Sequence, residues 1–278
     1  MDTQFLEKRA KKVFKESPLV HCVTNEITCE SMANALLYVN SKPIMADDPR
    51  EFQELFSQTD ALLLNLGHLS PDREKQLMAA SEYANQFNTP TVIDVVGVSV
   101  SSLRKKLAFE LLKNKPQVVK GNTSEMKKFC GLSSHGRGVD GHVLDQGKES
   151  LQELAEALKK LTKTYPDTSF LATGAVDVIV TGDKTYLLSN GVPELDKRTG
   201  TGDMVGALIA ALLGQGETVE SSLVMAVSYF NICGELAKKL GGSPIGMEDF
   251  NYHLMNELSL LHEQENWWQS IKGEKTND

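Results

Sequence analysis

The sequence predicts a three-layer α/β/α domain with a mostly parallel central sheet. Short apolar runs alternate along the chain with longer segments of helical periodicity, a rhythm typical of parallel strands joined by crossover helices. Several of these runs are apolar at consecutive positions, as expected for strands covered on both faces. No change in composition divides the 278 residues, of which 41% are hydrophobic. We therefore expect one domain over 1–278, with a frayed tail from about 272.

Apolar spacing predicts the elements of the first half. Met32, Leu36 and Val39 recur at helical spacing, and the run at 61–66 ends at Gly67, as buried strands often do. The expected strands are 19–24, 43–45, 61–66, 91–96 and 117–120, and the expected helices are 4–16, 27–39, 71–87 and 101–114.

The second half begins with a polar, glycine-rich segment at 132–149, which predicts a loop. An amphipathic helix is expected at 150–163 and a strand at 169–174. Gly182 and Asp183 separate two apolar runs, which predicts a hairpin over 177–188. Helices are expected at 203–213, 218–239 and 250–270.

Bulk properties exclude several classes of partner. The net charge of −8 argues against nucleic acid or an anionic membrane surface. No apolar run reaches the roughly 18 residues of a membrane span, and the first residues lack the apolar region of a signal peptide. Four cysteines are scattered without a CxxC pair, as in reduced proteins. We expect a cytoplasmic protein that binds small molecules.

The segment Gly200-Thr201-Gly202-Asp203 stands directly before the apolar run 204–213. Glycines at a helix start let successive N–H groups point at one spot, and the helix dipole adds partial positive charge there. Asp203 is placed to take a proton from a hydroxyl, so the motif predicts phosphoryl transfer to an alcohol. In the alternative interpretation, a threonine caps the helix, the glycines permit packing and Asp203 favours the dipole.

Polar residues follow most of the expected parallel strands. Because ligands bind beyond the carboxyl ends of such strands, these residues predict one pocket. They are Asn25, Asn65, Gly67, His68, Asp94, Lys120, Asn122 and Thr173. Taken singly, each is more often a helix cap or a satisfied buried polar group.

Asp94 interrupts an apolar strand, so its carboxylate must be paired, metal-bound or desolvated. Asp94 and Glu125 are the predicted Mg²⁺ residues, acting through water, and Lys120 is predicted to meet nucleotide phosphate. The chain lacks GxxxxGK[ST], the protein-kinase motif set and GxSxG, which excludes P-loop NTPases and disfavours α/β-hydrolases.

Over roughly 18–240 the chain resembles the hydroxyethylthiazole kinases of thiamin salvage, within the ribokinase-like kinases. The matching segments, in the same order as in that family, are LVHCVTN at 19–25, ANALL at 33–37, PIM at 43–45, NLGHLS at 65–70, KGNTSE at 120–125, TGAVD at 173–177 and GTGDM at 200–204.

The resemblance implies a ribokinase-like fold, a homotrimer with active sites between subunits, and ATP with Mg²⁺. It implies phosphorylation of 4-methyl-5-(2-hydroxyethyl)thiazole, with Asp203 as the base. The expected substrate-binding residues are Met45, Gly200, Asn25, Gly67 and His68, and those for ATP are Lys120, Thr173, Asn122 and Gly202.

Several departures from the family pattern concern function. Asp203 stands where many members carry cysteine, and Lys120 where arginine is usual; the segments 40–43 and 94–100 also differ on the substrate side. The alternatives are a kinase of another small aromatic alcohol such as a hydroxymethylpyrimidine, a nicotinamide-nucleotide-hydrate dehydratase on the same fold, and a non-catalytic binding protein.

Overall fold

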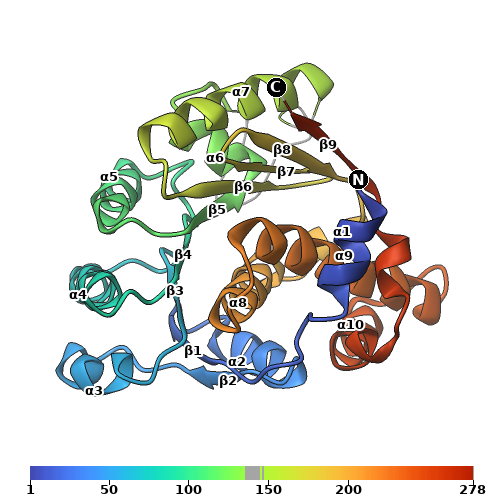
Figure 1. Cartoon of the computed structure of the whole chain (residues 1–278), viewed down its shortest axis with the longest axis horizontal. Coiled ribbons are helices and arrows are strands. Elements are labelled where there is room, and N and C mark those ends of the chain that lie inside the picture. The colour runs from blue at the N-terminus through green and yellow to red at the C-terminus, as the bar shows by residue number, and fades with distance from the viewer. Residues whose placement is uncertain (135–144, 146, 278) are drawn as a thin grey trace.

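A nine-stranded sheet forms the centre of the computed structural model, which describes residues 1–134, 145 and 147–277. Its order is β2-β1-β3-β4-β5-β6-β7-β8-β9 (Figure 1). The neighbours from β2 to β6 pair in parallel, and those from β6 to β9 pair antiparallel. The strands are β1 (Leu19–Val23), β2 (Lys42–Ile44), β3 (Ala61–Asn65), β4 (Thr91–Asp94), β5 (Val118–Asn122), β6 (Ser169–Thr173), β7 (Asp177–Thr181), β8 (Lys184–Leu188) and β9 (Gly273–Asn277).

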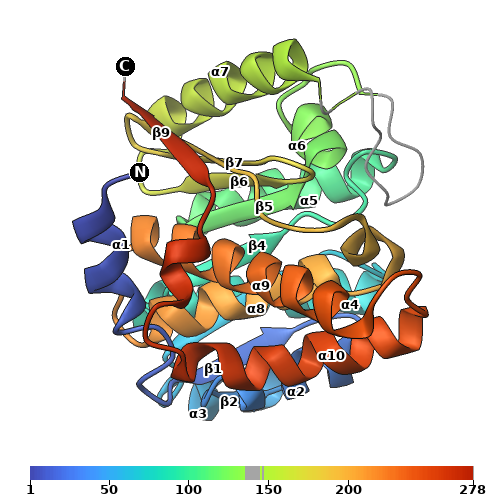
Figure 2. The ribbon, with the colours of Figure 1, turned by 90° about the vertical axis from the view of Figure 1, so that its right-hand side faces the viewer.

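Helices cover both faces of the sheet, as Figures 1 and 2 show from two directions. One face carries α3 (Phe52–Phe56), α4 (Pro71–Phe87), α5 (Ser102–Leu111), α6 (Thr123–Phe129) and α7 (Lys148–Thr164). The other carries α1 (Thr3–Ala10), α2 (Cys29–Tyr38), α8 (Thr201–Gly214), α9 (Val219–Gly241) and α10 (Met247–Leu260). Each layer buries its own apolar cluster against the sheet, which confirms the predicted three-layer, mostly parallel architecture.

The helix α8 is the buried helix that the sequence predicts. Every residue from Asp203 to Leu213 is buried, and α8 packs against α2, α9 and the strands β1, β3 and β4. A Cβ at Gly206 would lie only 3.2 Å from Leu63 Cδ1 and 3.5 Å from Lys120 Cδ, so this glycine lets α8 approach the sheet closely. This close approach brings the N-terminus of α8 to the carboxyl ends of the strands.

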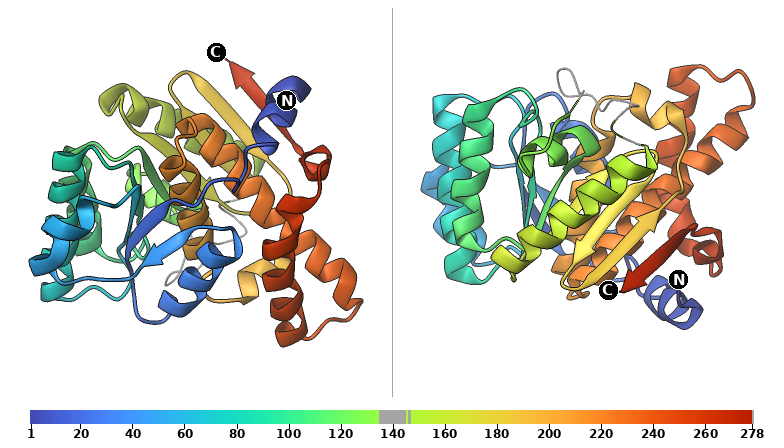
Figure 3. Two further views of the ribbon diagram at one scale, coloured as in Figure 1. Left: turned by 60° about the horizontal axis from the view of Figure 1, so that its bottom comes forward. Right: turned by 90° about the horizontal axis from the view of Figure 1, so that it is seen from above.

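The chain ends differ from the predictions. The tail from about 272 is not frayed, because Gly273–Asn277 forms β9 along the free edge of β8, and Lys275 Nζ lies 5.6 Å from the centre of the Tyr186 ring. The tail is polar in composition, but its backbone pairs with the backbone of β8 as an antiparallel strand. The views in Figure 3 show β9 close to the N-terminal helix.

Two predicted helices are shorter in the structure. The N-terminal helix ends at Ala10, and the helix expected to reach 270 ends at Leu260. Short 3₁₀ turns continue the second of these. The 3₁₀ segments whose bounds lie wholly within the described residues are Pro49–Glu51, Leu112–Asn114, Pro193–Lys197, Leu261–Glu263 and Trp267–Ser270.

The remaining elements agree in kind with the predictions. The helix expected at 71–87 has those bounds, and the hairpin at 177–188 is β7 and β8. The loop expected at 132–149 lies mostly outside the described residues. Among the described helices, none is both long enough and apolar enough to span a bilayer.

Candidate active site

The strand ends and the start of α8 meet at one polar cluster. Asn25 follows β1 and Asn65 ends β3, two strands that pair side by side in parallel. Asn25 Nδ2 lies 3.2 Å from Asn65 Oδ1, and both side-chain amides reach Asp203 in the first turn of α8. Three predicted site segments, far apart in sequence, are therefore joined by hydrogen bonds.

Asp203 accepts three side-chain hydrogen bonds. Asn65 Nδ2 donates to Oδ1 over 3.0 Å, and Asn25 Nδ2 donates to Oδ2 over 3.3 Å. Thr28 Oγ1 also donates to Oδ2. The aspartate is 8% exposed, so it is nearly removed from water but well supplied with donors. A carboxylate held by fixed donors at the start of a helix is placed to accept a proton from a hydroxyl.

Gly200 precedes α8 as its N-cap residue, with φ of +90°. That left-handed conformation suits glycine, and a Cβ there would also meet Thr28 Cγ2 at 2.8 Å. The first N–H groups of an α-helix lack partners within the helix and carry the positive end of its dipole. The turn at 200–203 thus has the character of an anion site, beside a carboxylate.

Lys120 and Asp94 form a buried ion pair next to this turn. Their positions are in register across β4 and β5, and Lys120 Nζ donates to Asp94 Oδ2 over 2.6 Å, with both side chains 2% exposed. Burial raises the pKa of Asp94 to about 6, against the opposing effect of Lys120. A Cβ on Gly202 would lie 3.7 Å from Lys120 Nζ, so the ammonium group sits beneath the N-terminus of α8.

Glu125 and Asn122 form a capping box at the start of α6. Asn122 Oδ1 accepts from Glu125 N, and Glu125 accepts backbone N–H bonds from Asn122 at Oε2 and from Gly97 at Oε1. Burial, together with the charge of Asp94, raises the pKa of Glu125 to about 7. Each Glu125 oxygen has further acceptor capacity, which suits a contact with metal-bound water better than a complete protein cage.

Among the described residues, no group of three or more His, Cys, Asp and Glu side chains has the arrangement of a metal site. Mg²⁺ commonly binds through one or two carboxylates with water and substrate phosphates. Asp94 and Glu125 fit that smaller role, and their assignment to Mg²⁺ stays a prediction.

The other predicted residues lie around this cluster at different depths. Gly67 is buried, and a Cβ there would meet Asn65 Oδ1 at 2.8 Å. Thr173 ends β6 in register with Asn122 and accepts at its carbonyl from Thr123 Oγ1 over 3.1 Å. Met45 is half-buried directly after β2, whereas His68 is exposed. Neither Met45 nor His68 is hydrogen-bonded to the cluster in the described part of the chain.

Two residues of the cluster were absent from the predicted site. Thr28 donates to Asp203, and half-buried Arg73 joins the two strand ends: its guanidinium donates to Thr24 O over 2.7 Å and to Asn65 O over 3.2 Å. Thr28 lies within a predicted helix, and Arg73 lies in the first turn of another. Neither position carries a motif, so only the tertiary contacts identify them.

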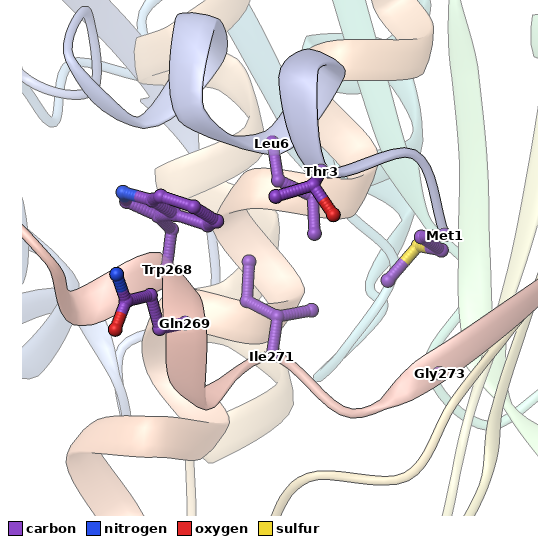
Figure 4. A pocket seen from close by; sticks show the side chains of 7 residues that line it. All are labelled: Met1, Thr3, Leu6, Trp268, Gln269, Ile271 and Gly273. Carbon is purple, nitrogen blue, oxygen red and sulfur yellow. The ribbon is translucent and has the colours of Figure 1, made fainter.

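Two of the cavities in the described part of the chain lie outside the cluster. One of about 300 Å³ lies next to the turn at 200–203 and is lined by Lys197, Arg198, Thr199, Met247, Glu248 and Asn251. Another of about 360 Å³ lies between α1 and the C-terminal segment, where Figure 4 shows Leu6 and Ile271 pointing toward one another. Neither cavity is lined by a predicted site residue.

Comparison with known proteins gives one consistent result. The model of the hydroxyethylthiazole kinase family matches residues 10–264. A hydroxyethylthiazole kinase of Enterococcus faecalis is 56% identical over 257 residues, which cover 92% of this chain and 93% of that protein. One of Lacticaseibacillus casei is 57% identical over 258 residues, or 93% of this chain and 92% of its own.

A solved structure agrees with these sequence matches. The hydroxyethylthiazole kinase protein of Pyrococcus horikoshii OT3 superposes with a TM-score of 0.84 at 28% identity, covering 99% of this chain and all of that one. The family match includes the strand ends and the turn at 200–203 with Asp203. The chain belongs to the hydroxyethylthiazole kinase family.

Proposed function

We propose that this chain transfers the γ-phosphoryl group of ATP to the primary hydroxyl of 4-methyl-5-(2-hydroxyethyl)thiazole and forms the thiazole monophosphate. The observation that carries the proposal is the position of Asp203, a nearly buried carboxylate with three fixed donors in the first turn of a buried helix. Membership of the family supports the choice of acceptor alcohol.

In this mechanism the acceptor hydroxyl gives its proton to Asp203 while its oxygen attacks the γ-phosphorus. The new O–P bond forms as the bond from phosphorus to the ADP oxygen breaks. N–H groups of the turn at 200–203 stabilise the charge that develops on the transferred group. The ammonium of Lys120, beneath the same turn, adds positive charge close to the phosphates.

We place the substrates as the sequence predicts. Asn25, Met45, Gly67, His68 and Gly200 lie on the thiazole side. Lys120, Asn122, Thr173 and Gly202 lie on the ATP side. When bound with ATP, Mg²⁺ would neutralise phosphate charge, with its waters held by Asp94 and Glu125. A cytoplasmic location stays a prediction.

We also propose a homotrimer with active sites between subunits. Ile27, which directly precedes Thr28, is 74% exposed, so apolar surface borders the site; Leu37, near the far end of α2, is 55% exposed. Apolar surface of this kind is commonly covered by a partner subunit. Light scattering at micromolar concentration should give three times the mass of the chain, and a monomer there would refute shared sites.

A panel of alcohols with ATP and Mg²⁺ tests the reaction. We expect ADP and thiazole monophosphate to form from hydroxyethylthiazole, with lower kcat/KM for hydroxymethylpyrimidine and pyridoxal. Faster turnover of the pyrimidine would refute the assigned substrate. Conversion of a hydrated nicotinamide nucleotide without alcohol phosphorylation would instead indicate a lyase, and binding without turnover would indicate a non-catalytic protein.

A further inference from the structure

Thr28 holds a position that the mechanism above does not use. It lies in the turn between β1 and α2, is 3% exposed, and its hydroxyl donates to Asp203 Oδ2. The same hydroxyl lies 3.7 Å from Met32 Sδ. A hydroxyl has one proton to donate, and a carboxylate is a far stronger acceptor than a thioether, so the proton of Thr28 belongs to Asp203.

The backbone fixes the orientation of Thr28. Its N–H donates to Asn25 Oδ1 over 3.1 Å, and its carbonyl accepts from Met32 N over 2.9 Å at the start of α2. Its methyl carbon Cγ2 lies against Gly200, only 2.8 Å from where a Cβ on that glycine would be. With the methyl group held there, the hydroxyl has little freedom to turn away from Asp203.

The two asparagine amides are also fixed. Gly67 N donates to Asn65 Oδ1 over 2.8 Å, so the amide nitrogen of Asn65 must face Asp203. Asn25 Oδ1 accepts from Thr28 N, so its amide nitrogen likewise faces Asp203. All three donors are therefore set by backbone groups and not by a free choice of side-chain rotation.

These bonds divide the two oxygens of Asp203 unequally. A carboxylate offers about four acceptor positions, two on each oxygen. In the described part of the chain, Oδ2 accepts from Thr28 and Asn25, whereas Oδ1 accepts only from Asn65. The unused acceptor position is thus on Oδ1.

We propose that Thr28 is a positioning residue for the base: it occupies Oδ2 and holds the carboxylate so that Oδ1 receives the proton of the acceptor alcohol. In that step the alcohol O–H bond breaks, its proton passes to Oδ1, and the freed electron pair forms the bond to the γ-phosphorus as ADP departs. The activity test of this assignment rests on the proposed kinase function. Its structural test depends only on the Thr28 and Asp203 side chains.

The variant Thr28→Val removes the hydroxyl and keeps the shape of the side chain. We expect kcat to fall by roughly 10- to 100-fold, the loss typical of one hydrogen bond to a charged group. The KM values for the alcohol and for ATP should change by less than about twofold, because Thr28 acts through Asp203. Thr28→Ser, which keeps the donor, should restore most of kcat.

Thr185→Val is the matched control. Thr185 lies in β8, is 4% exposed, and its hydroxyl has no hydrogen-bond partner among the described residues, so the same exchange at equal burial should leave kcat unchanged. A fall in kcat there as large as in Thr28→Val would show that the loss is a general effect of this exchange and would overturn the proposal.

A double-variant cycle separates positioning from a direct contact with substrate. In the Asp203→Asn background, the added Thr28→Val exchange should lower kcat by less than about twofold, because the residue through which Thr28 acts is already lost. An undiminished fall in that background would overturn the positioning role.

Crystal structures of the wild type and of Thr28→Val give a test without turnover. We expect the Asp203 carboxylate to rotate or become disordered once Thr28 no longer holds Oδ2; an unchanged, well-ordered carboxylate would overturn the proposal. If the wild type phosphorylates no alcohol, the proposed function fails, while this comparison still decides the role of Thr28.

Discussion

Replacing Gly200 by alanine should damage the site for two reasons that the structure separates. At φ of +90° an alanine is strained by about 1–2 kcal/mol. Its Cβ would also lie 2.8 Å from Thr28 Cγ2 and 3.3 Å from Thr28 Cβ, well inside ordinary contact. Overpacking of this kind costs about 1–3 kcal/mol, so the total expected loss of unfolding free energy is roughly 2–5 kcal/mol.

Gly216→Ala is the matched control, because Gly216 has φ of +87° and nothing within 4 Å of the added Cβ. It should lose only the backbone part, about 1–2 kcal/mol. Urea titrations of both variants at one protein concentration measure the two losses. The difference between them, roughly 1–3 kcal/mol, is then the contact with Thr28.

Activity provides the second readout. The added Cβ pushes on the residue that donates to Asp203, so kcat should fall in Gly200→Ala and stay unchanged in Gly216→Ala. Adding Thr28→Ser to Gly200→Ala removes Cγ2 and should recover most of the steric loss. Equal losses of stability in the two alanine variants would refute the argument, because the contact with Thr28 would then have no energetic effect.

Three further predictions concern buried carboxylates. Asp203→Asn keeps the shape but not the basicity, so kcat should fall by about 10²–10⁴ with little change in melting temperature, and near-full kcat would exclude Asp203 as the base. Lys120→Met leaves Asp94 buried without its partner and should cost about 3–5 kcal/mol in urea unfolding, whereas adding Asp94→Leu should recover much of it; no recovery would contradict the pairing. Burial raises the pKa of Asp177 to about 7, so the folded state keeps a proton that the unfolded chain has lost. That contribution to stability is complete below about pH 4 and disappears as the pH rises through about 7, and Asp177→Asn should flatten this fall in urea titrations across pH.

The fold was largely predictable because most of its helices and strands have a recognisable local sequence pattern. The strand at 61–66 is apolar at successive positions, and the helix at 71–87 follows Ser70, whose side chain caps it by accepting from Arg73 N. The strand β9 was missed because its pairing uses backbone groups, which residue composition does not reveal. The helix expected over 250–270 was too long because apolar residues at 3₁₀ turns fit a helical pattern equally well.

The site was predictable in its parts but not in its contacts. Asp203 and Asn25 stand in recognisable segments, and the rule that ligands bind at strand ends brought them together. The pairing of Asp94 with Lys120 depends on the register of β4 against β5, which a single sequence does not specify. Thr28 is one residue of an ordinary turn, and its role depends on where α8 sits, far along the chain.

The last strand of the sheet has a practical consequence for anyone who shortens or tags this protein. Strand β8 is shielded on its outer side by β9 alone, so a chain cut at residue 272 would leave a row of open backbone donors and acceptors. Such an edge invites pairing with another molecule. Aggregates or dimers formed by a shortened chain would then result from the exposed edge of β8 and not from the natural assembly. A tag is better attached through a linker beyond residue 278 than in place of the final strand.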